Sequence, residues 1–478
     1  MKEVNICFEQ TLTIIINNNI VYFLVKSRSG FEKLPESDVA AAVRKSKAEK
    51  NKICLKIAAI VGIVSSLVAC LTAFLLTRES NFIPIEFSRN MSANTDIQHM
   101  KEVEMVAQAA ERFSKTLYAV IKEEDKGNIL FSPYSVAAVL AMLSEGAGGK
   151  TLEMMRSRMF LPDSDSLRRG YRDSVPALRT NDNFTLDTAN TGFVMKRFQL
   201  LEEFKTILHE NYHAGMTELD FTDNEKAARM INDWVMRETR DKIKDLIPAD
   251  SLNAMTRLVL VNAIYFKADW QSKFDKVKTV DSPFWVSEEE SKQVQMMRLT
   301  KEISFANLDE LDCSMVEVPY KGERIVMQIL LPNKKTGVYE LEDKLASSDL
   351  QSLFIEGQFK VKVDVSLPRF KLSHSLPLSD SLQEMGMGNM FSPAADLSGI
   401  DGTRNLFVSK VLQKVFVEVN EEGSEAAAAT GVIVMMRSMP PRKQTFNVDH
   451  PFIFMIRDTL TGMLLFQGRV VDPSINTE

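Results

Sequence analysis

The sequence predicts an α+β fold in which helices come first and strands follow. Its 478 residues are 45% hydrophobic and 26% charged, enough apolar material for a large core. Residues 100–123 place apolar side chains close to a 3.6-residue period, which is typical of an amphipathic helix. Later runs rich in β-branched and aromatic residues favour strands. This order favours large sheets that are mostly antiparallel or mixed.

Further elements follow in chain order. Ser132-Pro133 precedes a helix expected over residues 135–143, because proline is favoured in the first helical turn. The run AARMINDWVMRETR predicts another helix over 227–240. Strands are expected at 257–266, 325–331, 359–367, 414–419 and 452–456. No linker or repeat interrupts residues 100–473, so we expect one large domain there.

Residues 1–99 are organised differently. Residues 57–76 are twenty uncharged residues, about 30 Å as a helix, which matches the apolar core of a bilayer. Six basic residues between 44 and 56 precede this segment, which predicts a cytoplasmic N-terminus and export of everything beyond 77. We therefore expect a signal anchor over 53–76 and a linker over 77–99. A cleaved signal peptide is the alternative, disfavoured by its length and its position in the chain.

The N-terminal extension, residues 1–52, is expected to be cytoplasmic or unstructured. Its run TLTIIINNNIVYFLV forms either a short strand pair or nothing. Beyond the anchor we expect the extracellular space, tethered as a type II single-pass protein or secreted after cleavage. Asn90-Met-Ser and Asn183-Phe-Thr are candidate glycosylation sites there. Of four cysteines only Cys313 lies within residues 100–473, so no disulfide is expected in that domain.

Motifs of the common enzyme classes are absent from the sequence. It contains no G-x-S-x-G, P-loop, G-x-G-x-x-G or H-E-x-x-H pattern. His209 and His213 share a helical spacing but have no third ligand nearby in the sequence, so we expect no metal site. A net charge of −6 gives no support to nucleic-acid binding. We expect a protein that is not an enzyme.

The segment EEGSEAAAATGVIVMMRSMPP, from Glu421 to Pro441, is unusual in composition. If it became a strand, alternate residues would share a face. One face is uncharged and begins with small side chains: Ser424, Ala426, Ala428, Thr430, Val432 and Val434. Small uncharged side chains can enter a closing gap in a sheet without a desolvation penalty. The segment is therefore suited to becoming a new strand that carries Arg437 with it.

This segment resembles the hinge and reactive loop of the serpin family. The resemblance extends to NILFSPYSVAAVLAML (128–143), LVNAIYFKADWQSKF (260–274), FNVDHPFIFMIRD (446–458) and LLFQGRVVDP (464–473). Together these runs span residues from about 100 to 473. The resemblance implies about nine helices around three β-sheets, with an exposed mobile reactive-centre loop at about 421–441. It also implies a monomeric inhibitor that traps a serine protease covalently, as the cut loop inserts into the central sheet.

Individual site residues transfer from the resemblance. In inhibitory serpins the bait residue is the seventeenth of the loop, which here is Arg437, so the reactive bond is Arg437–Ser438. Arginine bait implies a trypsin-like protease; Arg442 and Lys443 are rival baits. The hinge is Glu421, Glu422, Gly423, Ser424, Glu425, Ala426, Ala427, Ala428, Ala429 and Thr430. The polar shutter and the breach, where the loop first enters, are Ser132, Ser135, Asn262, Gln413 and Trp270. Gln413 replaces the histidine of many serpins, which leaves the stability of this shutter open.

Two further alternatives follow from the resemblance, and a third, an adhesion protein, rests on the expected membrane anchor alone. Arg168, Arg169, Arg172 and Arg179 lie where heparin-binding serpins carry a basic helix, but Asp163, Asp165 and Asp173 are interspersed. A solvated mixed-charge surface is therefore favoured over a glycosaminoglycan site, and no cofactor is expected. A non-inhibitory carrier, chaperone or storage serpin is disfavoured because such members carry bulky, charged or proline residues in the hinge. A membrane-tethered adhesion protein would leave the loop unexplained.

Overall fold

The structure is a computed structural model that describes residues 2–8, 10–17, 20–27, 30–33, 93–178, 183–348, 359–423 and 443–475. The chain divides into two compact units, Met1–Asn90 and Met91–Glu478, which are considered separately. The expected anchor at 57–76 and the sequon at Asn90 lie outside the described residues. Among the helices that are described, none is long and apolar enough to cross a membrane.

The first unit contains one antiparallel sheet in the order β1-β2-β3-β4. Its strands are Lys2–Phe8, Gln10–Asn17, Ile20–Ser27 and Gly30–Lys33. For the run TLTIIINNNIVYFLV the sequence allowed either a short strand pair or no element, and the structure has the β2–β3 hairpin there.

The second unit begins with a long helix and contains nine α-helices in its described part. They are α2 Ala93–Glu124, α3 Pro133–Glu145, α4 Gly149–Met159, α5 Ser164–Ala177, α6 Glu202–Tyr212, α7 Asn224–Glu238, α8 Val338–Ser347, α10 Ser379–Leu382 and α11 Ser398–Asp401. Short 3₁₀ or π turns are η1 Ala249–Ser251, η2 Lys276–Lys278, η3 Asp309–Leu311, η4 Gln383–Met387 and η5 Gly388–Phe391. The predicted helices at 100–123, 135–143 and 227–240 correspond to α2, α3 and α7.

A five-stranded sheet has the order β14-β15-β8-β6-β7. Its strands are β6 Phe184–Met195, β7 Gly215–Leu219, β8 Leu258–Ala268, β14 Phe370–Pro377 and β15 Val408–Val419. The neighbours β15 and β8 are parallel, in a register from Val408↔Leu258 to Phe416↔Tyr265. β14 and β6 pair antiparallel with β15 and β8, respectively.

A second, larger sheet has nine strands in two sections. Its strands are β5 Ile129–Phe131, β9 Val280–Trp285, β10 Ser291–Leu308, β11 Cys313–Pro319, β12 Ile325–Pro332, β13 Phe359–Pro368, β16 Gln444–Asn447, β17 Phe452–Asp458 and β18 Leu464–Val470. Long β10 joins the sections: it pairs with β9 and β13 over 291–305 and with β11 over 304–308. The described part of this unit therefore holds two hydrogen-bonded sheets, the larger of them in two sections that β10 joins.

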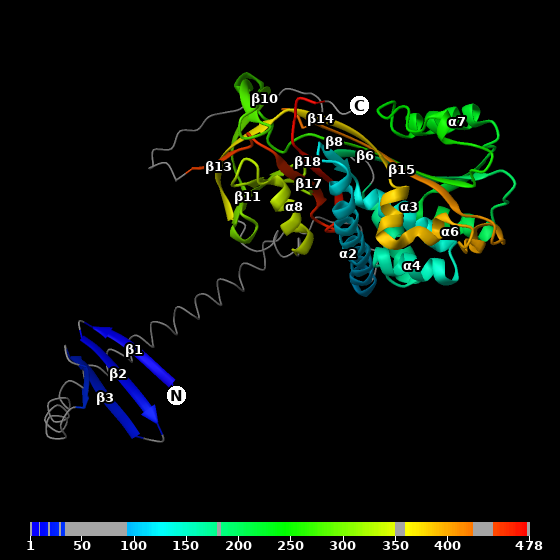
Figure 1. Cartoon of the computed structure of the whole chain (residues 1–478). Helices are drawn as coiled ribbons and strands as arrows, with labels where there is room; N and C mark the ends of the chain where they lie inside the picture. The colour runs from blue at the N-terminus through cyan, green and yellow to red at the C-terminus, as the bar shows by residue number, and fades with distance from the viewer. Residues whose placement is uncertain are drawn as a thin grey trace. The chain divides into compact units, whose positions relative to one another are not determined.

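Helix α3 lies at the centre of this unit and contacts β6, β8 and β18 (Figure 1). Twelve of its thirteen residues are buried, which follows from its nearly uninterrupted run of small and apolar side chains. Ser132 caps the helix by accepting from the N–H of Ser135, and Pro133 occupies the first turn. Helix α7 packs against β6 in Figure 1. The predicted α+β fold is confirmed.

Candidate functional site

Strand β15 ends at Val419, and the next four residues lie against Trp270. The backbone N–H of Trp270 donates to the carbonyl of Glu422 at 2.9 Å, and its indole Nε1–H donates to the carbonyl of Asn420 at 2.8 Å. Trp270 is 2% exposed and stacks on Tyr320 with ring centroids 4.3 Å apart. A rigid aromatic pair therefore holds the chain at the point where the loop segment begins.

Gly423 is required at this point by its backbone. Its φ is +100°, a value that side chains with a Cβ rarely adopt. A Cβ added there would lie 2.3 Å from the carbonyl oxygen of Ala268 and 2.4 Å from the nitrogen of Trp270. Glycine thus allows the hinge to approach the end of β8 more closely than any other residue could.

We expect Gly423→Ala to destabilise the native state. The left-handed φ and the contact with rigid backbone together predict a loss of roughly 1–3 kcal/mol of unfolding free energy. Gly215→Ala is the matched control, because a Cβ at Gly215 meets nothing within 4 Å. Equilibrium or thermal unfolding of both variants measures the difference; equal stabilities would contradict the role assigned to Gly423.

Two hinge glutamates are held by ion pairs with distant residues. Glu421 is 1% exposed; it accepts from Arg369 Nε at 2.7 Å and from the Thr279 hydroxyl at 2.5 Å. Glu422 pairs with Lys273 at 2.6 Å and Lys276 at 2.7 Å. Hydrogen bonds from Lys273 and then Lys276 lower the pKa of Glu422 to about 2. Burial raises the pKa of Glu421, but the bonds from Arg369 and Thr279 outweigh it, so its pKa is also lowered.

These lowered pKa values predict an acid-sensitive hinge. A carboxylate whose pKa is lower in the folded state stabilises that state fully above its unfolded pKa, here about 4.5. The contribution of Glu422 is therefore lost as pH falls from about 4.5 to about 2. We expect the stability difference between the native chain and Glu422→Gln to be constant above pH 5 and to shrink below it. Urea unfolding across pH 3–7 tests this; a difference that grew on acidification would contradict it.

The predicted shutter residues meet in one buried network. Gln413 Nε2 donates to Asn262 Oδ1 at 2.6 Å and to the carbonyl of Ser132 at 3.1 Å, while its Oε1 accepts from the N–H of Ser132 at 3.0 Å. Asn262 donates to the hydroxyl of Ser135. Ser132, Ser135, Asn262 and Gln413 are each at most 1% exposed. Glutamine therefore closes the network with one donor and one acceptor group, and it does so without a titratable ring.

Replacing Gln413 with leucine should destabilise the protein substantially. The change leaves the N–H of Ser132 and Oδ1 of Asn262 buried without this partner, at roughly 1–3 kcal/mol for each group, whereas the carbonyl of Ser132 still accepts from the N–H of Val136. We expect a total loss of about 2–5 kcal/mol after local relaxation. Gln383→Leu on the exposed face of η4 is the control and should change stability by less than about 0.5 kcal/mol. Denaturant midpoints compare the two, and equal midpoints would contradict the network.

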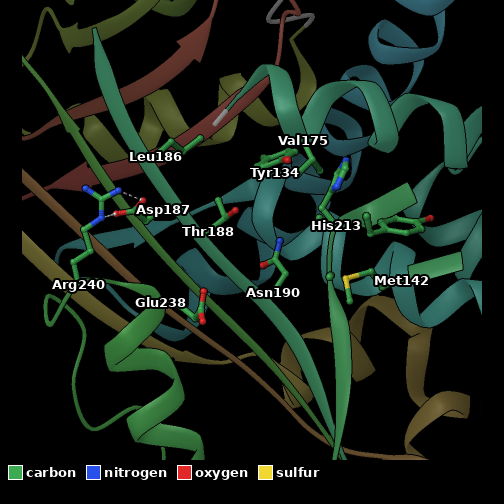
Figure 2. A pocket seen from close by; sticks show the side chains of 13 residues that line it. Tyr134, Met142, Val175, Leu186, Asp187, Thr188, Asn190, His213, Glu238 and Arg240 are labelled. Carbon is green, nitrogen blue, oxygen red and sulfur yellow. Dashed lines mark hydrogen bonds and ion pairs between the residues drawn. The ribbon is translucent and has the colours of Figure 1, made fainter. Parts of the chain in front are cut away.

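Sequence reasoning missed Asn190 as a shutter residue. It lies on β6 opposite Asn262, and Asn262 Nδ2 donates to its Oδ1. Asn190 also lines a cavity of about 390 Å³ between β6, α3 and the end of α7 (Figure 2). Figure 2 shows Asp187 paired with Arg240 on one side of that cavity, with Arg240 Nε 3.0 Å from Asp187 Oδ2. Asn190 was missed because the pairing register of β6 with β8, which places it opposite Asn262, cannot be inferred from a contiguous stretch of sequence.

Comparison with known proteins decides the family. A family model described as Serpin (serine protease inhibitor) matches residues 108–473. The chain belongs to the serpin family. Leukocyte elastase inhibitor of Bos taurus is 38% identical over 379 residues, which are 78% of this chain and 100% of that protein. Human Serpin B3 is 35% identical over 387 residues, covering 77% and 99%. Serpin48 of Tenebrio molitor, a solved structure, is 35% identical with a TM-score of 0.70, covering 77% and 98%.

Membership confirms the predicted fold and family. The family model is described as serine protease inhibitor, not as an enzyme, so the expectation that this serpin is not an enzyme is confirmed. The relatives support inhibition of a serine protease. The hinge from Ser424 to Thr430 and the bond Arg437–Ser438 lie outside the described residues, so these assignments stay predictions.

The remaining predicted sites lie as follows in this serpin. Asn183 is exposed at the start of β6, and its glycosylation stays a prediction. The arginines of α5 are paired with carboxylates: Arg168 with Glu145 at 2.8 Å, Arg169 with Glu102 at 2.7 Å and Arg172 with Asp173 at 2.9 Å; Arg179 lies outside the described residues. Within the described ranges, no group of three potential metal ligands is found.

Proposed function

We propose that this serpin inhibits a trypsin-like serine protease by trapping it during cleavage of Arg437–Ser438. The observation that carries the proposal is the position of the hinge. Gly423, the last described residue before the predicted insertion segment, lies beyond the end of β15 and against the backbone at the end of β8. A cut loop is therefore tethered at the mouth of the boundary between these two parallel strands.

The chemistry begins in the protease. Its serine oxygen attacks the carbonyl carbon of Arg437 and forms an ester, while the amide bond to Ser438 breaks and the Ser438 amine leaves with a proton. The chain from Ser438 onward is then no longer joined to Arg437. Residues 424–437 are free to move away from the released chain, with the protease still attached to Arg437 through the ester.

Insertion of that segment is favoured by strand geometry. From Gly423 it would run antiparallel to both β15 and β8, replacing one parallel pairing with two antiparallel ones, which are slightly more stable per residue. Its fourteen residues at about 3.4 Å each span roughly 48 Å. Strand β15 has twelve residues and spans roughly 40 Å. The cut end would therefore reach the far end of the sheet.

The composition of the hinge separates inhibition from the carrier alternative. Between Ser424 and Thr430 the only charged residue is Glu425, which alternation places on the face opposite Ser424 and Ala426. A strand with small uncharged side chains can pass between β15 and β8 without burying an unpaired charge. Nothing in this stretch opposes insertion in the way that the hinge of a carrier would.

The neighbourhood of Lys443 favours Arg437 as bait over the rival positions. Lys443 lies one residue before β16, and its Nζ is 3.5 Å from the carboxylate of Asp364 on β13. A bait residue must be able to enter the pocket of a protease, which such an anchored position hinders.

A panel of trypsin-like, chymotrypsin-like and elastase-like proteases tests the proposal. Each is incubated with the full chain and examined by denaturing gel electrophoresis, and the released peptide is identified by intact mass. We expect a covalent complex with trypsin-like enzymes and a peptide that begins at Ser438. Cleavage without a stable complex would overturn trapping, and a peptide beginning at Lys443 or Gln444 would overturn the assignment of Arg437.

A further inference from the structure

A basic pocket of about 780 Å³ lies at the end of the five-stranded sheet far from the hinge. It opens where β6 ends and where β8 and β15 begin: Lys196 follows β6, Arg257 precedes β8 and Phe407 precedes β15. Four cationic side chains line it, those of Lys196, Arg197, Arg257 and Arg404, against the single carboxylate of Asp401. That carboxylate already accepts from the backbone and hydroxyl of Thr403 at 2.9 and 2.7 Å.

Two of these cations have no ion-pair partner among the described residues. Arg197 and Arg257 instead make only ring contacts, with guanidinium carbons 5.1 and 5.5 Å from the ring centroid of Phe198. The Nε of Arg257 is shielded from solvent and has no hydrogen-bond partner within the described ranges. Lys196 interacts electrostatically with Asp220, and Arg404 pairs with Asp396 at 3.0 Å. Two of the four cations that line the pocket therefore carry positive charge that no described carboxylate neutralises.

The guanidinium of Arg257 contacts two aromatic rings. Its guanidinium lies 5.5 Å from Phe198 and 5.2 Å from Phe407, the residue before β15. Its backbone N–H donates to the hydroxyl of Ser409 on β15 at 2.9 Å. A planar guanidinium that contacts two rings is prepared to bind an oxyanion, because these contacts reduce the side-chain freedom that binding would remove. The same contacts join the beginnings of β8 and β15.

The arginines of helix α5 differ from Arg197 and Arg257 of the pocket because each of them already has a carboxylate partner. Arg168, Arg169 and Arg172 are each committed to a carboxylate, so an anion would have to displace an existing partner. In the pocket, Arg197 and Arg257 need give up no such partner. Oxyanions carrying several negative charges are the ligands that a concave cluster of arginine and lysine recognises best.

We propose that this pocket binds the sulfate or phosphate groups of a polyanion, and that the bound anion holds β8 and β15 together at their starts. Contacts from Arg257 on one side and from the residue range 403–405 on the other would span the boundary between the strands. This is the end of the sheet at which an inserted loop would have to finish. The second half of the proposal rests on the proposed function, whereas the binding itself does not.

Calorimetric titration of the full chain with sucrose octasulfate and with inorganic tripolyphosphate tests the site. We expect saturable binding of at least one probe with one molecule per chain, weakening as salt is raised. The double variant Lys196→Gln/Arg197→Gln changes only exposed side chains and should raise Kd at least tenfold. Arg257→Lys keeps the charge but loses the planar fork and should also weaken binding. Tighter binding of the octasulfate identifies a sulfated saccharide as the class of polyanion that the pocket binds. Tighter binding of tripolyphosphate identifies a phosphate polymer instead.

The charge-matched control is Arg229→Gln/Lys334→Gln, which removes two exposed cations that do not line the pocket. Its Kd should stay within twofold of the native value. Absence of saturable binding of both probes, or an equal loss in the control, would overturn the site.

The effect on the strands is measured as the stoichiometry of inhibition of trypsin. A saturating probe should raise that stoichiometry at least twofold for the native chain and leave it unchanged for Lys196→Gln/Arg197→Gln. An unchanged value for the native chain would overturn the clamp while leaving the site intact. If no covalent complex forms even without the probe, the proposed function fails, and the titration still decides the site.

Discussion

Arg437→Ala is expected to abolish most of the inhibition of trypsin-like proteases. In such enzymes the bait guanidinium enters a pocket with a carboxylate at its floor, and removing it leaves that charge buried without a partner. Breaking a buried ion pair in this way costs about 3–5 kcal/mol. At about 1.4 kcal/mol per tenfold, the association rate should fall between a hundredfold and several thousandfold. Progress curves against trypsin under pseudo-first-order conditions measure this rate.

The matched control is Arg442→Ala, which removes the same side chain five residues along the segment. It should change the association rate by less than about twofold, because Arg442 lies outside the predicted bond. Arg437→Lys should retain inhibition at a reduced rate, since lysine keeps the charge but loses the bidentate geometry. A large loss with Arg442→Ala and a small one with Arg437→Ala would show that the bait is misassigned.

Ser424→Arg is expected to convert the inhibitor into a substrate. If the loop inserts, Ser424 enters the sheet at the start of insertion, before most of the stabilisation is gained. An arginine at that position would bury an unpaired charge, which costs several kcal/mol. A barrier raised by only about 2.8 kcal/mol slows insertion roughly a hundredfold, so hydrolysis of the acyl-enzyme would win. The variant should be cut after Arg437 at a near-normal rate and leave the protease active.

Glu425→Arg is the control for this experiment, because it is one residue along and on the face that alternation places in solvent. Its stoichiometry of inhibition should stay near that of the native chain, whereas that of Ser424→Arg should rise at least tenfold. One-to-one trapping by Ser424→Arg would refute insertion, although the fold and family would stand.

Local patterns were sufficient for most elements of the domain. Helix α3 and strands β12 and β17 were predicted because each is a contiguous run whose own periodicity or composition indicates its state. Strand β15 was predicted to begin at 414 but begins at Val408. Its first half contains Ser409, Lys410 and Gln413, which interrupt the apolar pattern. Of these, Gln413 is fully buried because the shutter network satisfies its amide, a compensation that a local pattern does not reveal.

The sequence by itself determined the family and pointed to four polar residues that meet in the buried network, since these follow from contiguous stretches and their order. Only the tertiary structure decided which residues meet. Asn190 joins Asn262 and Gln413 because β6, β8 and β15 are neighbours in one register. Arg369 reaches Glu421 across 52 positions, and Arg257 contacts the rings of both Phe198 and Phe407. Such contacts depend on how strands far apart in the chain pair, and strand pairing is set by packing of the whole core, which no short stretch encodes.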